Sequence, residues 1–220
     1  MSPPEALILA GPNGAGKTTS SALLVPATTL FLNADVIAAR LLEEGHPTAG
    51  IDVAAGRVIL EQLRALVAAG DSFCVETNLA GRGFLRWIGD WRTRGYDVRL
   101  MFFALDSPEL ALRRVATRVS MGGHDIPEPV VRRRWAVGLR ALFDVYLPIV
   151  DRWIVLDNSG GSVHQVAEGH RQGGVRRILD HERWERLLSL AAEVGASAAR
   201  PGGEFFDPVT PVDDDGEPQP

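Results

Sequence analysis

The chain alternates short apolar runs with longer amphipathic stretches. Runs of about four to eight apolar residues fit strands buried on both faces, and apolar positions three or four residues apart fit helices with one buried side. The strand candidates are residues 6–10, 29–32, 72–76, 98–105 and 153–156. Because helix-like stretches separate them, the pattern predicts an α/β domain with a five-stranded, mostly parallel sheet flanked by helices.

Amphipathic stretches predict seven helices, and their ends carry ordinary helix signals. Gly45, Gly70 and Gly95 close three of them, and Ser107 followed by Pro108 opens another. The predicted helices span residues 18–25, 35–44, 51–69, 84–94, 107–119, 129–146 and 182–194. Two short runs, at 163–166 and 175–179, predict a small hairpin before the last helix. We therefore expect one domain over residues 1–196, with the hairpin and last helix at about 163–196.

Residues 197–220 differ in composition from the rest of the chain. They are rich in Pro, Gly and Asp, which predicts an acidic, disordered tail. The formal charge of −5 at pH 7 belongs to this tail, since without its six acids 22 acids face 23 bases. A body so close to neutral argues against a nucleic-acid partner. The six acids are Glu204, Asp207, Asp213, Asp214, Asp215 and Glu217.

Cysteine content and hydropathy indicate a cytoplasmic protein. Cys74 is the only cysteine, so no disulfide can form within the chain, which fits a reducing compartment. It lies in an apolar run, where we expect a buried thiol rather than a nucleophile. The N-terminus lacks the basic region of a signal peptide, and its apolar stretch is too short to span a bilayer. We therefore expect no membrane partner.

Residues 11–18 read Gly-Pro-Asn-Gly-Ala-Gly-Lys-Thr, a complete match to G-x-x-x-x-G-K-[ST]. Lys17 is the only lysine beside 22 arginines, and it stands where a compact ammonium must fit between phosphates. A strand precedes the motif and a helix follows, so loop amides and the helix N-terminus would bind phosphate. This predicts a P-loop NTPase that binds ATP and Mg²⁺, with Thr18 as the metal ligand. The predicted nucleotide-binding residues are Gly11, Pro12, Asn13, Gly14, Ala15, Gly16, Lys17, Thr18 and Thr19.

Polar groups follow three of the predicted strands, at the sheet edge where α/β proteins bind ligands. Asp35 and Glu76 are candidates for the base that accepts a hydroxyl proton in phosphoryl transfer. Asp35 has an alternative role as a helix cap, and Glu76 has one as a group behind the metal. For the pair Asp157 and Asn158, an ordinary strand end is favoured over a functional role.

A basic stretch at about 113–140 predicts a helical lid that closes over ATP. Its local excess of +5 suits a small polyanion, and Gly122-Gly123 separates its two helices. Arg118 is the candidate cation for the transferring phosphate. Arg132, Arg133 and Arg134 point several ways around a helix, so at most two of them face one site. His124 either contacts a phosphate or makes a local hydrogen bond in its turn.

Six sequence blocks together resemble the zeta toxin family of kinases. The Asn-Ala-Asp, Glu-Thr and Gly-Gly-His-x-Ile-Pro elements in this order are more specific than the phosphate loop alone. The blocks follow the family's order and cover roughly residues 6–160. They are Ala-Gly-Pro-Asn-Gly-Ala-Gly-Lys-Thr-Thr (10–19), Phe-Leu-Asn-Ala-Asp (31–35), Val-Glu-Thr-Asn-Leu-Ala-Gly (75–81), Leu-Asp-Ser-Pro-Glu-Leu-Ala (105–111), Arg-Val-Ser-Met-Gly-Gly-His-Asp-Ile-Pro (118–127) and Leu-Asp-Asn-Ser (156–159).

The resemblance implies a small-molecule P-loop kinase with ATP and Mg²⁺ as cofactors. Its characterised members phosphorylate the 3′-hydroxyl of the sugar in UDP-N-acetylglucosamine, and an antitoxin is a candidate partner. The resemblance implies Asp35 as the catalytic base, Arg118 as a lid arginine, and Glu76 and Thr77 as contacts to the nucleotide sugar. His124, Arg132 and Arg133 are the candidates for a second lid cation on the substrate. The chain is shorter than those toxins, so other hydroxyl acceptors stay open.

Two other functions remain as alternatives to a small-molecule kinase. A nucleotide-driven switch or motor ATPase is disfavoured, because the chain has no Leu-Ser-Gly-Gly-Gln and no Asn-Lys-x-Asp motif. It also has no strand ending in the apolar-Asp-Glu pattern of motor ATPases. A polynucleotide kinase is disfavoured by the near-neutral body.

Overall fold

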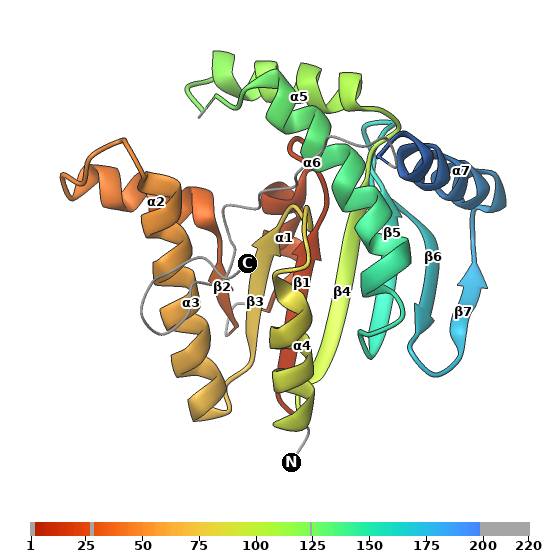
Figure 1. The fold of residues 1–220 in the computed structure, drawn as a ribbon, viewed down its shortest axis with the longest axis horizontal. Helices are drawn as coiled ribbons and strands as arrows, with labels where there is room; N and C mark the ends of the chain where they lie inside the picture. Colours follow the sequence, from red (N-terminus) through yellow and green to blue (C-terminus); the bar gives the residue numbers. More distant parts are fainter. Residues whose placement is uncertain (1–2, 27–28, 124, 199–220) are drawn as a thin grey trace.

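The computed structural model describes residues 3–26, 29–123 and 125–198, with side chains to residue 195 (Figure 1). These residues form an α/β fold around one sheet in the order β2-β3-β1-β4-β5-β6-β7. The first five strands in that order are parallel, as predicted. They are β1 (Glu5–Ala10), β2 (Leu30–Leu32), β3 (Phe73–Thr77), β4 (Asp97–Ala104) and β5 (Arg152–Asp157).

The prediction of five strands is too small, because the sheet has seven. The predicted hairpin does not stand apart from the sheet: β6 (His164–His170) pairs antiparallel with β5, and β7 (Gly174–Ile178) with β6. These strands have half-exposed or fully exposed faces, so polar residues occupy many of their positions and hide the strand pattern. Gly169 lets β6 lie close to Trp153 of β5, since a Cβ at position 169 would lie 2.3 Å from the Trp153 ring.

All seven predicted helices are present, with ends shifted by up to a few residues. The main difference is in the predicted helix 129–146, which ends its α-helical part at Ala141 and continues as a π-helical segment. No helix in the described part of the chain is long and apolar enough to cross a membrane. The helices are α1 (Lys17–Leu24), α2 (Ala34–Glu43), α3 (Ile51–Ala69), α4 (Phe84–Thr93), α5 (Pro108–Ser120), α6 (Glu128–Ala141), η1 (Leu142–Tyr146) and α7 (His181–Ala198).

The core centres on β1, which lies between β3 and β4 in the sheet and is buried from Ala6 to Ala10. Tryptophans serve as packing anchors: Trp91 meets Phe73 edge-on at 5.0 Å, and Trp153 stacks on Trp184 at 5.9 Å. Cys74 is fully buried, and burial raises the pKa of its thiol to about 12. The thiol is therefore an inert core group at neutral pH.

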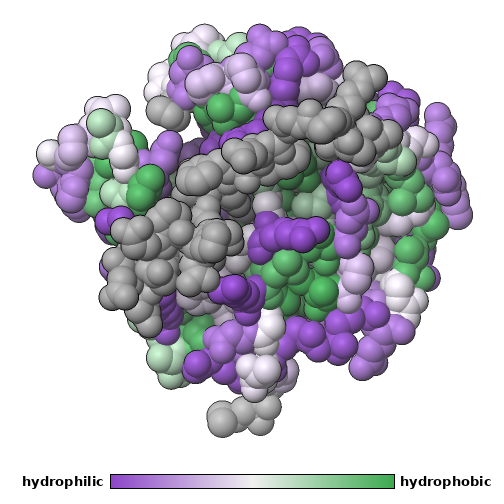
Figure 2. Space-filling model, in the orientation of Figure 1, coloured by the Kyte–Doolittle hydropathy of each residue, from purple (hydrophilic) through white to green (hydrophobic). Residues whose placement is uncertain are grey.

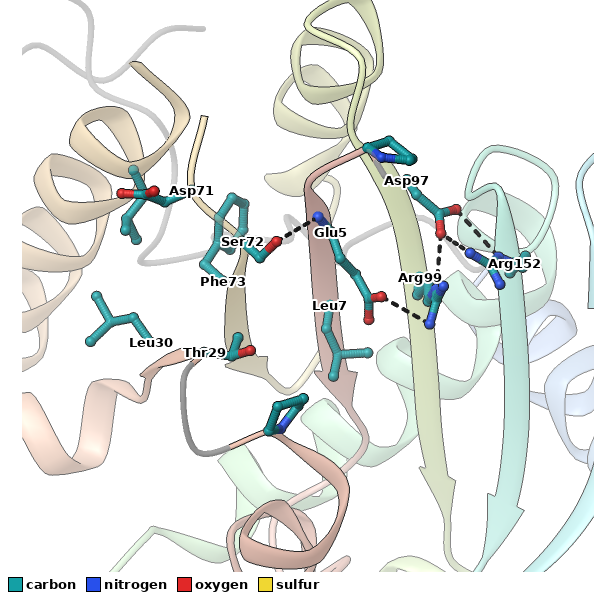
Figure 3. A pocket seen from close by; sticks show the side chains of 13 residues that line it. Glu5, Leu7, Thr29, Leu30, Asp71, Ser72, Phe73, Asp97, Arg99 and Arg152 are labelled. Carbon is teal, nitrogen blue, oxygen red and sulfur yellow. Dashed lines mark hydrogen bonds and ion pairs between the residues drawn. The ribbon is translucent and has the colours of Figure 1, made fainter. Parts of the chain in front are cut away.

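A surface hollow of about 830 Å³ lies at the amino-terminal ends of the parallel strands (Figure 3). A row of charges crosses it, in which Glu5 pairs with Arg99 at 2.8 Å and Asp97 pairs with both Arg99 and Arg152. These charges satisfy one another, and the phosphate loop lies at the opposite edge of the sheet. At that edge, α5 and the start of α6 lie above the strands (Figure 1), and the surface of this region is largely hydrophilic (Figure 2).

Candidate phosphoryl-transfer site

The glycines of residues 11–16 let the backbone turn tightly between β1 and α1. Gly11, Gly14 and Gly16 have φ values of 138°, 77° and 84°, which disfavour any side chain. At Gly11 a Cβ would also lie 2.3 Å from the carbonyl oxygen of Phe103 on β4. Gly16 precedes α1 and has no side chain to cap it, so the first amides of α1 remain available to an anion.

Lys17 lies inside the loop and is 5% exposed. Its Nζ donates hydrogen bonds to the carbonyl oxygens of Gly11 at 2.7 Å and Pro12 at 3.0 Å, and lies 3.7 Å from Glu76 Oε1. Burial lowers the pKa of Lys17, while the carboxylates of Glu76 and Asp35 act in the opposite direction. The ammonium is thus held at the mouth of the loop by carbonyls and a carboxylate.

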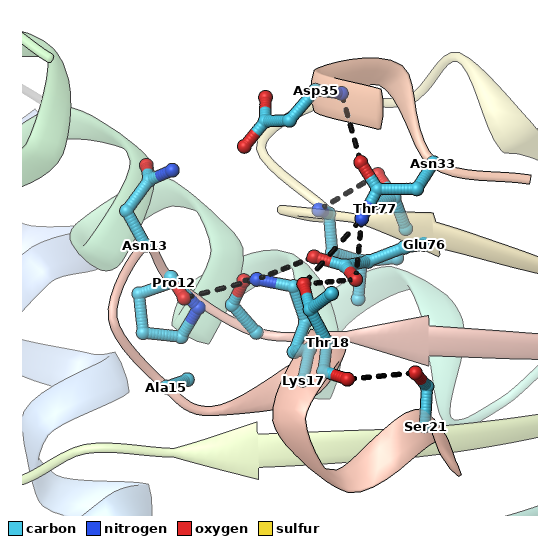
Figure 4. Close-up of polar contacts among 12 residues, drawn as sticks. Pro12, Asn13, Ala15, Lys17, Thr18, Ser21, Asn33, Asp35, Glu76 and Thr77 are labelled. Atoms are coloured by element: carbon cyan, nitrogen blue, oxygen red, sulfur yellow. Dashed lines mark hydrogen bonds and ion pairs between the residues drawn. The ribbon is translucent and has the colours of Figure 1, made fainter. Parts of the chain in front are cut away.

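The Glu76 carboxylate of β3 binds one side chain from α1 and one from the residue before α2 (Figure 4). Thr18 Oγ1 and Asn33 Nδ2 each donate to Glu76 Oε2 at 2.8 Å. Asn33 Oδ1 in turn accepts from the backbone N–H groups of Asp35 at 2.8 Å and Val36 at 3.2 Å, and so caps α2. Sequence reasoning placed Asn33 in the Asn-Ala-Asp element after the second strand but gave it no role of its own, although an Asn just before a helix is a recognisable capping signal.

These groups suit Mg²⁺. The Thr18 hydroxyl and the Glu76 carboxylate are hard oxygen donors 2.8 Å apart. No cluster of three or more His, Cys, Asp or Glu residues capable of holding a metal occurs in the described residues. Mg²⁺ is commonly bound by one or two protein oxygens, water and nucleotide phosphates, so this small donor set fits a metal that arrives with ATP.

Asp35 lies in the first turn of α2, and its carboxylate extends away from Asn33 (Figure 4). Because Asn33 caps the helix, the interpretation of Asp35 as the cap is wrong. The Asp35 side chain is 62% exposed and lies 3.7 Å from Arg118 on α5. The structure thus brings a solvent-accessible carboxylate and an arginine of α5 together beside the phosphate loop.

Gly122 and Gly123 follow the end of α5 and separate it from α6, as predicted. The N–H of Gly123 donates to the carbonyl of Arg118 at 2.9 Å and that of Gly122 to Val119 at 2.9 Å, an arrangement typical of helix C-termini. A Cβ on Gly123 would lie 2.6 Å from Arg118 Cγ. The glycine therefore lets the chain fold back against the stem of Arg118. His124 lies outside the described residues.

The three consecutive arginines of α6 have different surroundings. Arg132 pairs with Glu109 of α5 at 2.6 Å and with Glu128 of α6 at 2.7 Å, and both carboxylates are exposed. Arg133 and Arg134 line a small hollow of about 90 Å³ together with Thr77 and the loop after β3. Arg134 also reaches the phosphate loop, donating to Asn13 Oδ1 at 3.4 Å. Sequence reasoning did not single out Arg134, because which arginine faces the site depends on how α6 packs.

Two further residues meet the phosphate loop from outside. Asn158, after β5, donates from Nδ2 to the carbonyl of Ala15 at 2.9 Å. Arg114, on α5, donates to the carbonyls of Gly14 at 3.3 Å and Asn158 at 2.5 Å. No sequence signal marked the contacts to the phosphate loop, since Arg114 lies 100 residues from Gly14 and Asn158 lies 143 residues from Ala15.

Several known proteins are similar to this chain. An uncharacterised protein of Haemophilus influenzae is 28% identical over 131 residues, which cover 60% of this chain and 92% of that protein. A chain of the AvrRxo1-ORF1:-ORF2 complex with ATP superposes with a TM-score of 0.69 at 20% identity, over 86% of this chain. This chain spans 64% of the length of that neighbour. A chain of the PezAT chromosomal toxin–antitoxin system of Streptococcus pneumoniae superposes with a TM-score of 0.55 at 16% identity, over 88% of this chain and 87% of that one.

These likenesses agree with the architecture, a mixed sheet flanked by helices with a phosphate loop after β1. The comparison with protein families also supports a nucleotide-binding domain. The family model AAA_33, described as an AAA domain, matches residues 7–142, more than half of the chain. The chain therefore belongs to the AAA_33 family of P-loop AAA domains.

Proposed function

We propose that this protein is a Mg²⁺-dependent kinase that transfers the γ-phosphoryl group of ATP to a hydroxyl of a small molecule. The observation that carries the proposal is the convergence of Lys17, Thr18, Glu76, Asp35 and Arg118 at one edge of the sheet. A phosphate cradle, oxygen ligands for a metal, a base and a cation are the parts that phosphoryl transfer requires.

Each residue would have one task. The phosphate loop and Lys17 would hold the β- and γ-phosphates, with Thr18 and Glu76 holding Mg²⁺ directly or through water. Mg²⁺, when bound with ATP, would neutralise part of the phosphate charge. Asp35 would accept the acceptor hydroxyl's proton while that oxygen bonds to the γ-phosphorus and the bond to the ADP oxygen breaks. Arg118 would stabilise the charge of the transferring group.

The exposed Asp35 carboxylate favours a kinase over a switch ATPase. A kinase needs a base that a second substrate can reach, and Asp35 meets this condition at 62% side-chain exposure. Thr77, Arg133 and Arg134, around the small hollow beside the loop, are the residues we assign to acceptor binding, whereas Arg132, which pairs with Glu109, is not among them. A nucleotide sugar, with UDP-N-acetylglucosamine first, is the acceptor class we propose, because of the resemblance to zeta toxins.

A protein partner is a second part of the proposal. The two solved neighbours are named as a two-protein complex and a toxin–antitoxin system, respectively. By analogy, we propose that this chain also binds an antitoxin-like protein. Co-purification of the chain with the product of an adjacent reading frame would test this, and recovery of the chain alone at stoichiometric co-expression would contradict it.

Incubation with γ-labelled ATP, Mg²⁺ and a panel of nucleotide sugars, nucleosides and dinucleotides tests the main proposal. We expect one acceptor to gain the label as a phosphate ester, and Lys17→Ala to remove the transfer. Release of all label as inorganic phosphate with every acceptor would contradict a kinase. Transfer to a nucleoside instead of UDP-N-acetylglucosamine would keep the kinase and replace the acceptor.

A further inference from the structure

Asn158 is fixed on both its backbone and its side chain. Its N–H donates to the carbonyl of Ala104 on β4 at 3.2 Å, which continues the pairing of β5 with β4. Its side-chain amide donates to the carbonyl of Ala15 at 2.9 Å. An uncharged side chain from the end of β5 therefore holds the backbone of the phosphate loop from the outside.

Arg114 holds the neighbouring carbonyl. Its guanidinium donates to Gly14 at 3.3 Å and to the backbone carbonyl of Asn158 at 2.5 Å. On the other side of the Gly14–Ala15 peptide, the N–H of Ala15 donates to the carbonyl of Pro12 at 3.2 Å. That peptide is thus held from both sides, and Arg114 ties α5, the loop and the segment after β5 together.

The planarity of the peptide bond connects these contacts to phosphate binding. In a trans peptide the C=O and the following N–H point in opposite directions. Holding the carbonyl of Ala15 toward Asn158 therefore turns the N–H of Gly16 away from Asn158. A donor oriented in advance for an anion loses little free energy to reorganisation when the ligand binds.

The glycines of the motif make room for both side chains. A Cβ on Gly16 would lie 2.6 Å from Asn158 Nδ2, and a Cβ on Gly14 would lie 2.9 Å from Arg114 Cβ. The motif thus needs glycine at these two positions for close packing as well as for positive φ.

A buried network keeps Asn158 in place. Arg183 of α7, 9% exposed, donates to Asp157 Oδ1 at 2.8 Å and to Ser159 Oγ at 3.1 Å. Ser159 Oγ donates to the same Asp157 oxygen at 2.7 Å. The residues on both sides of Asn158 are thereby attached to α7, so the C-terminal helix supports the segment that contacts the loop.

We propose that Asn158 and Arg114 are positioning residues that orient the phosphate loop of this protein for nucleotide phosphates. They act through the backbone carbonyls of Ala15 and Gly14 and touch no reacting atom. The proposal rests on the nucleotide-binding part of the proposed function and is independent of which acceptor is used.

The test compares ligand binding by Asn158→Ala, wild type and the control Gly160→Ala. Gly160 belongs to the same loop, and a Cβ there meets nothing within 4 Å. Calorimetry would give the dissociation constants for MgATP, tripolyphosphate and adenosine. Loss of one neutral hydrogen bond should weaken MgATP and tripolyphosphate binding by about three- to tenfold. Adenosine binding by Asn158→Ala, and every ligand's binding by Gly160→Ala, should stay at the wild-type value.

The outcomes separate this proposal from its alternatives. Unchanged MgATP and tripolyphosphate affinities in Asn158→Ala would overturn it, and so would an equal loss for adenosine, which would place Asn158 at the nucleoside. A lower unfolding temperature with unchanged affinities would also overturn it, by showing a purely structural role. Absence of MgATP binding by wild type would contradict the proposed function as well.

In a double-mutant cycle, Arg114→Ala combined with Asn158→Ala should weaken tripolyphosphate binding by less than the product of the single effects, because both act on one loop. Effects that multiply fully would contradict a shared action on the loop.

Discussion

Two ion pairs of the same length mark the two sides of the candidate site. Lys17 and Glu76 lie 3.7 Å apart with side chains 6% and 13% exposed, whereas Arg118 and Asp35 lie 3.7 Å apart with side chains 38% and 62% exposed. The first pair is shielded from water and shares hydrogen bonds with the loop, while the second is screened by solvent and salt. The Lys17–Glu76 side of the site is thus fixed by its own contacts, whereas the Arg118–Asp35 side is open to solvent.

The contacts of α5 and α6, which form the predicted lid, indicate which parts of them are held in place. At their base, Trp135 donates to the carbonyl of Leu105 at 3.0 Å, and Arg114 is bonded to the phosphate loop. Arg132 forms ion pairs with the exposed carboxylates of Glu109, in the first turn of α5, and Glu128, in the first turn of α6. A closure that brings Arg118 to ATP is therefore expected to leave the segments around Arg114 and Trp135 in place and to involve less than the whole predicted lid of 113–140.

A change of Lys17 should have the largest effect on phosphoryl transfer, because it removes the buried ion pair with Glu76 directly. Lys17→Ala should bring phosphoryl transfer to background and weaken ATP binding. Lys17→Arg should fail too, because a planar fork does not fit where the ammonium lies between the Gly11 and Pro12 carbonyls. Label transfer and circular dichroism together separate lost chemistry from lost fold. Full transfer by Lys17→Arg would refute the role of a compact cation.

Asp35→Asn tests the exposed side of the comparison at its proposed base. The amide keeps the size of the carboxylate but takes no proton, so turnover should fall by roughly 10²–10⁴-fold. The melting temperature and ATP affinity should stay at wild-type values, because Asn33 caps α2. A lower melting temperature with near-normal turnover would contradict a catalytic role, and Glu76 would then be the leading candidate.

Arg118→Ala should lower turnover by roughly 10²-fold with little change in ATP affinity, since the charge it meets develops during transfer. Arg132→Ala is the matched control: it removes an arginine from the same pair of helices whose partners are Glu109 and Glu128. Its turnover should stay within about twofold of wild type. Equal losses of turnover and ATP affinity in Arg118→Ala would indicate a ground-state role instead.

The free energy of unfolding should also respond more to changes on the buried side than to changes at exposed ion pairs, and these effects should be smaller. Asn33→Ala removes a helix cap and a hydrogen bond to Glu76, and should lower the free energy of unfolding by about 1 kcal/mol. Arg132→Ala should change it by no more than about 0.5 kcal/mol, since its partners are exposed. Urea unfolding of both variants provides the measurement. A larger loss of unfolding free energy in Arg132→Ala than in Asn33→Ala would contradict this expectation.

Local sequence predicted the parts of the fold that depend on short segments. The phosphate loop is contiguous in sequence, so its strand, glycines and Lys17 could be read directly, and the five parallel strands are apolar enough to stand out. The hairpin's place in the sheet was missed, because β7 is nearly all exposed and leaves little periodic signal.

The contacts that join distant segments were the ones that sequence could not supply. Asn158 looked like a strand end, and its bond to Ala15 exists only because β5 and the phosphate loop end at the same edge of the sheet. Among the arginines of α6, only packing decides that Arg134 faces Asn13 while Arg132 faces Glu109. The predicted disordered tail at 197–220 lies almost wholly outside the described residues and stays a prediction.

The fate of the γ-phosphate tests the central proposal most directly. Wild-type protein and Asp35→Asn would each receive γ-labelled ATP with either a deproteinised small-metabolite fraction or a macromolecular fraction. A kinase predicts faster ATP consumption by wild type with the small-metabolite fraction, label in a phosphate ester, and loss of both in Asp35→Asn. ATP consumption stimulated only by the macromolecular fraction, with all label released as inorganic phosphate, would contradict it and favour a switch ATPase.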